Sequence, residues 1–359
     1  MNERYDALAL FSGGLDSILA CKVLQAQGRS VLGLHFTSPF FGRPEKIAYW
    51  RTVYGIEVAA FDIGAEYVDM LAEGPPHGYG SLLNPCLDCK IMMLARAREL
   101  LGRFGAGVLI SGEVLGQRPM SQRRDALNLI RNAAGVRDVL VRPLCAKRLE
   151  PTPAELDGRV DRERLLAISG RGRKEQLRLA REFGITEMPT PAGGCRLTEA
   201  ESASRYLRLL QAGGRPGPED FQLCHAGRHF WFGAHWLVVG RNQANNERLL
   251  GLARDADALL KLKDLPGPLG VLRRPDGLAA EDAALASAAA LVASYSGKAR
   301  AAGGPAAVLV KVAGQTRTLT VTPARAEDAG WSEPDLSGLK DWKAAAPSPF
   351  APRPGREPE

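Results

Sequence analysis

The sequence has few cysteines for its length, and it has no apolar run long enough to cross a membrane. Six cysteines in 359 residues are too few for a scaffold held together by disulfides. A transmembrane helix needs about 20 consecutive, mostly apolar residues. The first five residues lack the basic and apolar regions of a signal peptide, because an apolar run begins at Ala7. These absences predict a soluble, cytoplasmic protein that has no membrane partner.

An internal repeat is also missing, while the length suffices for two domains with sizeable cores. Residues 213–218 are rich in Gly and Pro and predict a linker. The Pro-rich carboxyl terminus predicts disorder. We therefore expect a catalytic domain over residues 1–200, a helix and linker over 201–218, a smaller α+β domain over 219–325 and a disordered tail over 326–359.

A glycine-rich loop near the start of the chain lacks the lysine of a Walker A motif and does not fit the glycine spacing of dinucleotide-binding loops. It reads Ser12-Gly13-Gly14-Leu15-Asp16-Ser17, after an apolar run over Ala7–Phe11 that predicts a buried strand. Two glycines permit a tight turn, and the helix predicted over residues 18–25 offers unpaired N–H groups to an anion. The loop predicts a phosphate cradle, and an ordinary turn before a capped helix is the alternative.

Four further β-like runs alternate with helical patterns in the first 200 residues. The runs cover residues 30–36, 56–61, 108–111 and 139–144, and helical patterns include residues 87–103, 160–168 and 173–183. This alternation predicts an α/β fold, in which a parallel sheet is covered by helices on both faces. Ligands of such sheets bind at the carboxyl ends of the strands.

Three cysteines lie in segments that suggest chemistry. Cys86 and Cys89 come at the start of a predicted helix, where the helix dipole is expected to lower the thiolate pKa. Cys195 lies in a loop over residues 188–196 that is rich in Pro and Gly. If the sheet is parallel, all three thiols lie near its carboxyl edge.

Four explanations of these cysteines remain open. Three thiolates could hold a [4Fe–4S] cluster with one iron left open, or Cys89 and Cys195 could carry a persulfide and resolve a disulfide. Zinc would need a fourth ligand. The candidates for that ligand are His77, Cys145 and Cys224. Inert cysteines are the fourth explanation.

Charge is unevenly distributed along the chain, whose formal net charge is +7. Between Arg118 and Arg181 there are sixteen Lys or Arg and eight Asp or Glu residues, so this window carries +8 and the remainder is nearly neutral. A concentrated basic surface favours a polyanionic partner such as nucleic acid. Solvated helix faces are the alternative.

The glycine-rich loop resembles the pyrophosphate loop of the ATP pyrophosphatases, or PP-loop enzymes, which adenylate a carbonyl or amide oxygen and release pyrophosphate. The resemblance implies an adenine nucleotide α-hydrolase-like fold, ATP as a substrate, and Asp16 as a hard oxygen ligand of Mg²⁺. Main-chain groups at Phe36 would contact the adenine, and Gly112-Glu113 resembles a second nucleotide-contacting segment. The nucleotide-binding residues implied are Ser12, Gly13, Gly14, Asp16, Ser17, Phe36, Gly112 and Glu113.

The cysteine segments resemble the tRNA 2-thiouridylases of the same superfamily, over approximately the first 200 residues. The resemblance rests on Asn84-Pro85-Cys86-Leu87-Asp88-Cys89 and on Gly194-Cys195. It implies that Cys89 and Cys195 are catalytic, and that Cys86 marks the form that binds an iron–sulfur cluster through Cys86, Cys89 and Cys195. It also implies tRNA as substrate and a sulfur donor, either a cysteine desulfurase or inorganic sulfide.

The second half of the chain lacks the β-barrel that ends the familiar thiouridylases. Its β-like runs cover residues 229–232, 236–239, 307–312 and 316–321, and its helical stretches cover residues 245–258 and 280–294. Residues 225–230, 240–242 and 245–249 resemble the RNA-binding domain of NFACT proteins. This resemblance implies an RNA partner.

These resemblances together predict an ATP-dependent tRNA sulfurtransferase. A uracil carbonyl oxygen would attack the α-phosphate of ATP, pyrophosphate would leave, and sulfur would then displace AMP to give thiouridine. Two alternatives stay open. One is a PP-loop enzyme that adenylates a small molecule, and the other is a non-catalytic RNA-binding protein that holds ATP as a structural ligand. The oligomeric state and the position of the thiolated uridine are also left open.

Overall fold

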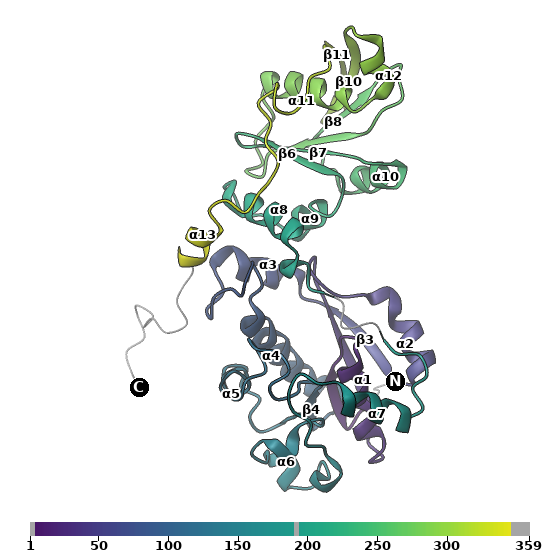
Figure 1. Ribbon diagram of the computed structural model, residues 1–359, viewed down its shortest axis with the longest axis vertical. Helices are drawn as coiled ribbons and strands as arrows, with labels where there is room; N and C mark the ends of the chain where they lie inside the picture. The colour runs from purple at the N-terminus through teal and green to yellow at the C-terminus, as the bar shows by residue number, and fades with distance from the viewer. Residues whose placement is uncertain (1–3, 190–193, 346–359) are drawn as a thin grey trace. The chain divides into compact units, whose positions relative to one another are not determined.

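The computed structural model describes residues 4–189 and 194–345 (Figure 1). The chain divides into two compact units, the first formed by residues 1–196 with 343–359 and the second by residues 197–342. Within the described ranges, no helix is both long and apolar enough to cross a membrane.

The first unit is built on a five-stranded sheet in the order β3-β2-β1-β4-β5, and all its neighbouring strands are parallel. The strands are β1 (Ala7–Leu10), β2 (Val31–Thr37), β3 (Glu57–Asp62), β4 (Val108–Ser111) and β5 (Leu140–Val141). The predicted parallel sheet is therefore confirmed. The fifth strand is shorter than predicted, because the chain turns after Val141 with a hydrogen bond from the Cys145 N–H to the Arg142 carbonyl (3.0 Å).

Helices cover both faces of this sheet, as predicted. They are α1 (Leu15–Gln25), α2 (Ile47–Tyr54), α3 (Gly64–Glu73), α4 (Cys86–Phe104), α5 (Arg124–Ala133), α6 (Pro153–Leu156) and α7 (Lys174–Glu182). Ala7 and Ala9 share a buried cluster with residues of α1, α2 and α7. Side chains alternate along a strand, so the opposite face of β1 is free for α4, which contacts β1 and β4.

The predicted helix over residues 160–168 is wrong. A 3₁₀ turn over Arg162–Arg164 is capped by Asp161, whose carboxylate accepts from the Glu163 N–H (3.0 Å). The chain then runs extended, and the Leu166 N–H donates to the Pro143 carbonyl (2.9 Å). Local side-chain capping and backbone pairing with residues 143–147 override the helical pattern here.

The second unit contains a six-stranded antiparallel sheet in the order β11-β10-β8-β9-β7-β6. Its strands are β6 (Arg228–Phe232), β7 (His235–Val239), β8 (Ala258–Leu262), β9 (Gly270–Arg273), β10 (Ala306–Val312) and β11 (Gln315–Val321). The helices after residue 199 are α8 (Ala200–Gln211), α9 (Pro218–Leu223), α10 (Gln243–Leu252), α11 (Asp282–Ser294), α12 (Gly297–Ala302) and α13 (Leu339–Ala345). The predicted α+β character is confirmed, but β8 and β9 were not predicted. Ala258, assigned to a helix from the sequence, begins β8.

The predicted disordered tail begins too early. Trp331 is 4% exposed within the core of the second unit, and its indole N–H donates to the Ser287 hydroxyl (2.9 Å). Trp231 and Ser332 exchange two backbone hydrogen bonds, of 2.8 and 3.0 Å. Residues 326–345 therefore include ordered structure, while residues 346–359 lie outside the described part.

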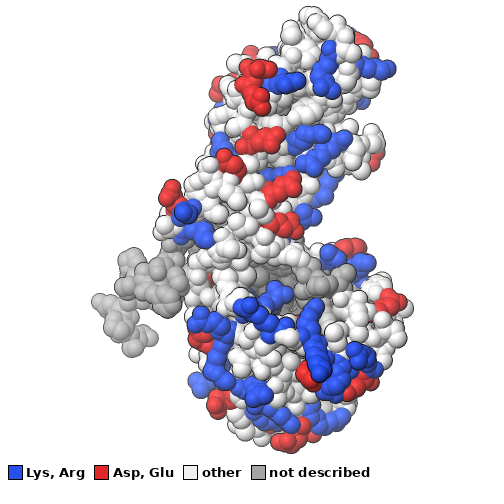
Figure 2. Space-filling model, in the orientation of Figure 1, with Lys and Arg blue, Asp and Glu red and all other residues white. Residues whose placement is uncertain are grey.

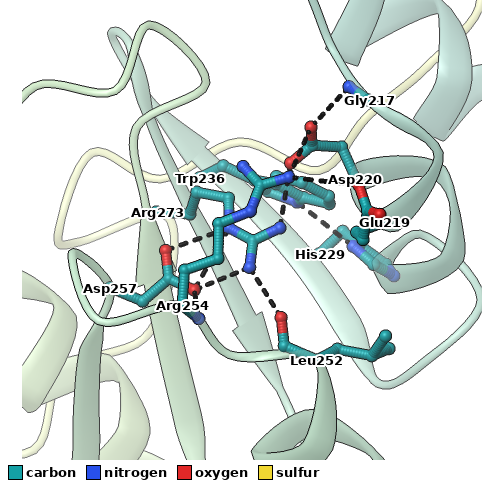
Figure 3. Close-up of polar contacts among 9 residues, drawn as sticks. All are labelled: Gly217, Glu219, Asp220, His229, Trp236, Leu252, Arg254, Asp257 and Arg273. Carbon is teal, nitrogen blue, oxygen red and sulfur yellow. Dashed lines mark hydrogen bonds and ion pairs between the residues drawn. The ribbon is translucent and has the colours of Figure 1, made fainter.

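A buried ionic cluster joins α9 to the sheet of the second unit (Figure 3). The Arg273 guanidinium lies between the carboxylates of Asp220 on α9 (2.9 Å) and Asp257 before β8 (2.6 Å), and all three side chains are less than 5% exposed. Arg273 also donates to the Leu252 carbonyl (2.8 Å), and the Gly217 N–H donates to Asp220 (2.8 Å). The cluster fixes the segment before β6 to the sheet.

Candidate active site

The glycine-rich loop connects β1 to α1 at the carboxyl edge of the parallel sheet. Gly14 is the N-cap of α1, and no side chain caps this helix end. The Ser17 hydroxyl donates to the Gly14 carbonyl (2.8 Å), while the Ser12 hydroxyl lies 3.4 Å from both the Gly14 N–H and the Ser17 hydroxyl. The Ser17 N–H donates to the Gly14 carbonyl (3.0 Å). The N–H groups of Leu15 and Asp16 have no partner among the described residues, so they remain open to an anion, as a phosphate cradle requires.

Gly13 is the position in the loop where only glycine fits. Its φ is +74°, and a Cβ there would lie 2.2 Å from the ring of Trp50 on α2. Trp50 is itself buried, packed edge-on against Phe11 (5.3 Å between ring centroids) and His35 (4.8 Å). Packing of Trp50 in the core therefore fixes the conformation of the loop at Gly13.

The loop lies where the strand order reverses, between β1 and β4. Sheets of this kind leave a crevice at such a point, outside the carboxyl ends of the strands. Gly112, directly after β4, approaches the loop so closely that a Cβ would lie 2.5 Å from the backbone of Asp16. The structure thus brings the two predicted nucleotide-contacting segments together.

Asp16 has one engaged and one open carboxylate oxygen. Its Oδ2 accepts a hydrogen bond from Gln117 Nε2 (2.8 Å), and the Gln117 Oε1 accepts from Gln176 Nε2 (3.3 Å). Its Oδ1 is buried and has no partner among residues 4–189 and 194–345. An oriented carboxylate with one open oxygen fits a Mg²⁺ ion, which binds proteins through one or two carboxylates and completes its shell with water and phosphate.

Glu113 is 2% exposed and is used for an internal ion pair. Its Oε2 accepts from the Ser111 hydroxyl (2.9 Å) and from the Arg142 guanidinium (2.9 Å). Burial alone would raise the pKa of Glu113, but the charges of Arg142 and Lys90 and these hydrogen bonds outweigh it, so the pKa is lowered. A direct contact of Glu113 with nucleotide remains a prediction.

The end of β2 lies beside the loop. The Phe36 side chain is buried, so any contact with adenine would involve its main chain, as predicted from the sequence. His35 is a core residue with both ring nitrogens engaged: the Arg43 N–H donates to Nε2 (2.7 Å), and Nδ1 lies 2.9 Å from the Phe11 carbonyl. Burial lowers the pKa of His35, which keeps the ring neutral. His35 is therefore a structural residue that packs beneath the loop through Phe11 and Trp50.

Cys86 and Cys89 occupy the first turn of α4, as predicted. The Cys89 N–H donates to the Pro85 carbonyl (2.8 Å), and Asn84 Nδ2 lies 3.2 Å from the Cys86 sulfur. The expected lowering of the thiolate pKa is wrong for Cys89, because burial raises the pKa of this thiol to about 11. Desolvation of the thiolate outweighs the helix dipole at this position.

Tyr67 on α3 is affected by all three cysteines, and no sequence motif indicated it. It is 1% exposed, and its hydroxyl forms a hydrogen bond with Cys89. Burial raises its pKa most, and the thiols of Cys89, Cys195 and Cys86 contribute further. Tyr67 thus lies within electrostatic range of Cys86, Cys89 and Cys195.

The described cysteines do not form a site for a single metal ion. Within residues 4–189 and 194–345, no group of three or more His, Cys, Asp or Glu side chains could hold a metal ion. Residues 190–193, which precede Gly194-Cys195, lie outside the described part. The described residues thus contain no ready-made site for a single metal ion, and binding of a [4Fe–4S] cluster by Cys86, Cys89 and Cys195 stays a prediction.

The fourth ligands considered for zinc are engaged elsewhere. The His77 ring and N–H both contact the Asp88 carboxylate (2.7 and 2.9 Å), which ties the preceding loop to α4. The Cys145 thiol donates to the Glu113 carbonyl (3.2 Å). Cys224 is buried in the second unit, where desolvation raises its pKa.

Basic side chains gather on the face of the first unit seen in Figure 2, over α5, α6 and α7, with acidic side chains among them. Six of the eight acidic residues between 118 and 181 form ion pairs with Lys or Arg. The window keeps its charge of +8 but carries it as a mixed surface. Such a surface is compatible with nucleic acid, and it also fits solvated helix faces.

These features define a class of protein, namely an α/β phosphate-loop unit with thiols at its carboxyl edge, followed by an antiparallel-sheet unit. Residues 3–149 match the family model described as thiamine biosynthesis protein (ThiI), and residues 227–331 match the one described as NFACT protein RNA binding domain. The chain thus joins a domain of the ThiI type, a PP-loop family of tRNA thiolation, to an RNA-binding domain of the NFACT type. The resemblances to PP-loop tRNA thiolation enzymes and to the NFACT RNA-binding domain are confirmed, while the first matched region ends before Cys195.

Two solved structures show weak similarity to the chain. The C-terminal part of the fibronectin/fibrinogen-binding protein from Streptococcus suis is 18% identical over 43% of this chain and 71% of that one, with a TM-score of 0.25. A predicted subunit of tRNA methyltransferase from Methanocaldococcus jannaschii is 14% identical over 49% and 75%, with a TM-score of 0.32. These scores are too low to carry an argument. The comparison with curated proteins gives no match.

Proposed function

We propose that this protein is an ATP-dependent tRNA sulfurtransferase that converts a uridine to a thiouridine. The observation that carries the proposal is the meeting of two segments at one edge of the sheet. Gly112 approaches Asp16 so closely that the phosphate loop and the end of β4 form one site, with an open Asp16 oxygen within it. In this proposal residues 1–200 form the catalytic domain and residues 219–325 hold the RNA.

The loop would bind the pyrophosphate part of ATP through main-chain N–H groups of Gly13 and Gly14 and the hydroxyls of Ser12 and Ser17. The uncapped start of α1 adds further N–H groups and the positive end of its dipole. Asp16 would hold Mg²⁺ through Oδ1, and the ion would offset the charge that develops on pyrophosphate. Gln117 fixes the orientation of the Asp16 carboxylate through its hydrogen bond to Oδ2 (2.8 Å).

Adenylation makes the uracil oxygen part of a good leaving group, AMP. The oxygen attacks the α-phosphorus, the bond to pyrophosphate breaks, and an O-adenylated uridine results. A cysteine desulfurase persulfide would transfer its outer sulfur to one thiolate of the Cys89–Cys195 pair and leave as a thiol. The resulting protein persulfide attacks the same ring carbon, and AMP leaves with the former carbonyl oxygen. The second thiolate then attacks the protein-bound sulfur, which releases thiouridine and forms a Cys89–Cys195 disulfide. An external dithiol must reduce that disulfide before the next turnover.

We favour the thiol pair over the cluster because the charges of Cys89 and Cys195 both raise the pKa of Tyr67, while the described residues offer no ready-made site for a metal ion. Iron and labile-sulfide analysis after anaerobic purification tests this choice. Iron-free protein that thiolates tRNA supports the pair. About four irons per chain, lost in Cys86→Ser, would contradict it.

The function itself is tested by separating adenylation from sulfur transfer. Cys89→Ala and Cys195→Ala are expected to retain tRNA-dependent pyrophosphate release and to form no thiouridine, measured by nucleoside mass spectrometry. Cys224→Ala in the second unit is the matched control. If either site variant thiolates tRNA at the wild-type rate, the assignment is wrong. Pyrophosphate release that needs no tRNA would instead indicate a small-molecule acceptor.

A further inference from the structure

A cavity of about 210 Å³ opens on the first unit between α5 and the segment after β5. It is separate from the phosphate loop and serves no step of the proposed reaction. One wall is α5, from which Arg124, Asn128 and Arg131 line the cavity. Their spacing of four and three residues places them on one face of the helix.

Arg131 is the key residue of this cavity. Its Nε is buried and has no hydrogen-bond partner in the part of the chain that the structure describes. The described residues also include no ion pair to its guanidinium. Burial and the nearby charges of Arg142 and Arg137 all lower its pKa, so the charges that act on it most are positive. A buried N–H donor in such a place calls for an acceptor that is itself negative.

The other charged residues that line the cavity do not provide a negative partner for Arg131. Arg142 is neutralised by Glu113 (2.9 Å), and Glu155 is neutralised by Arg162 (2.8 Å). Glu155 also accepts from the N–H and hydroxyl of Thr152. Among the lining residues, the remaining charges are those of two arginines and of one exposed glutamate.

Those two arginines are Arg124 and Arg131, and the glutamate is Glu150. Arg124 uses one guanidinium nitrogen on the Arg148 carbonyl (2.9 Å) and keeps its other donors for a ligand. Two guanidinium groups with an amide from Asn128 between them match the oxygens of a phosphate, since guanidinium donates in a planar fork. The positive excess favours a phosphate over a neutral ligand.

We propose that this cavity binds a phosphate group of an RNA backbone. The choice of RNA as the source rests on the proposed tRNA substrate, whereas the phosphate chemistry rests on the cavity alone. The site would hold the RNA on the catalytic unit, in addition to the RNA-binding domain over residues 227–331. Phosphate contacts of this kind position a nucleic acid without reading its sequence.

The first arm of the test measures the anion directly. Inorganic phosphate is titrated into the full chain while the side-chain Nε–H resonances of arginine are followed by NMR. A saturable shift of the Arg131 resonance, weakened in Arg124→Ala, is expected. If phosphate produces no saturable shift, the cavity is not an anion site and the proposal is wrong.

The second arm measures tRNA affinity at several salt concentrations. Arg131→Ala is expected to weaken tRNA binding and to reduce the slope of log K against log salt by about 1. Arg124→Ala, at an exposed position, should act in the same direction if Arg131→Ala folds poorly. Glu150→Gln should tighten binding. Arg51→Ala, which removes an exposed charge paired with Glu57 on another part of the first unit (2.8 Å), is the control.

The outcomes separate this proposal from the proposed function. If wild-type protein binds tRNA and Arg131→Ala keeps the slope of Arg51→Ala, the RNA subsite is wrong although the tRNA partner stands. If phosphate shifts Arg131 but wild-type protein fails to bind tRNA, the source of the phosphate is not RNA. In that case the proposed function fails as well.

Discussion

The Arg273 cluster of the second unit and the carboxyl edge of the first unit differ in how completely their buried polar atoms are paired. In the second unit, the three guanidinium nitrogens of Arg273 and all four carboxylate oxygens of Asp220 and Asp257 have partners (Figure 3). At the carboxyl edge of the first unit, by contrast, Asp16 Oδ1, Glu113 Oε1 and Gln176 Oε1 are buried and have no partner within residues 4–189 and 194–345.

This difference separates polar groups that can bind a ligand from polar groups that hold the fold together. Buried polar atoms almost always have hydrogen-bond partners, so unpartnered oxygens mark places where a ligand, ion or water completes the structure. A fully paired cluster has nothing left to offer a ligand and serves to hold elements together. This contrast supports the proposal that the carboxyl edge of the first unit binds the ligand, whereas the Arg273 cluster holds elements together.

Removal of Arg273 should have the largest effect on stability. Arg273→Ala leaves two buried carboxylates without their counter-charge, so the free energy of unfolding should fall by about 4 kcal/mol. Urea unfolding of the full chain, followed by tryptophan fluorescence, measures this change. Arg254→Ala is the control, because Arg254 is 43% exposed and its pair with Asp220 should contribute less than about 1 kcal/mol. Equal losses for both variants would show that the cluster is not a structural unit.

Glu113 should contribute stability that depends on pH. Its pKa is lowered in the folded protein, so its contribution is complete above its unfolded pKa of about 4.3 and is lost as the pH falls through the folded pKa. Glu113→Gln leaves the buried Arg142 unpaired and should lower the free energy of unfolding by about 3 kcal/mol at pH 7. The difference from wild type should shrink below about pH 4.

Glu163→Gln is the matched control for this measurement. Glu163 is 90% exposed and lies 3.5 Å from Lys147, so its loss should change stability by at most about 0.5 kcal/mol. A difference between Glu113→Gln and wild type that persists unchanged at low pH would mean that the Glu113 carboxylate is not ionised in the folded protein.

Gln117 should act on Mg²⁺ rather than on stability. Gln117→Ala removes the hydrogen bond that orients Asp16, and loss of such a supporting contact weakens metal binding by roughly 10-fold. The concentration of Mg²⁺ needed for half-maximal ATP binding, measured by calorimetry, should rise accordingly. Gln122→Ala, a nearby glutamine outside this hydrogen-bonded chain, serves as the comparison. An unchanged Mg²⁺ requirement in Gln117→Ala would remove Asp16 Oδ1 from the proposed metal site.

Tyr67 should have the smallest effect. Its hydroxyl stabilises the Cys89 thiolate, so Tyr67→Phe should raise the pKa of Cys89 further above about 11. Alkylation of Cys89 at a fixed pH, followed by mass spectrometry, should slow by a few-fold, on the order of 1 kcal/mol for one hydrogen bond. Faster alkylation would indicate that Tyr67 only shields the thiol.

The sequence predicted the parts of the site that are local, and it missed those that depend on tertiary contacts. The loop at Ser12–Ser17 and the helix start at Cys86 follow from glycine placement and apolar runs, which act over a few residues. Strands β8 and β9 were missed because their short apolar runs resemble buried helical segments. Tyr67 belongs to no motif, and only packing of α3 brings it to Cys89.

Gln117 could have been found by the expectation that polar side chains after a parallel strand lie at the ligand edge. The thiol pKa of Cys89 could not, because helix position predicts a lower value and only burial reverses it. The ordered segment around Trp331 was obscured by the Pro-rich composition that follows it. Composition averages over the whole tail, whereas burial of the single side chain of Trp331 extends the fold beyond residue 326.

The central claim is that the phosphate loop binds ATP for the adenylation of a uridine in tRNA. The most direct test measures release of pyrophosphate and AMP from ATP with and without tRNA, in wild type and in Asp16→Asn. The account predicts that both products require tRNA, that AMP and thiouridine form in equal amounts, and that Asp16→Asn loses at least about 100-fold in rate, as removal of one charge-stabilising group typically does. ATP cleavage to ADP and phosphate, or product release that ignores both tRNA and Asp16, would contradict the account.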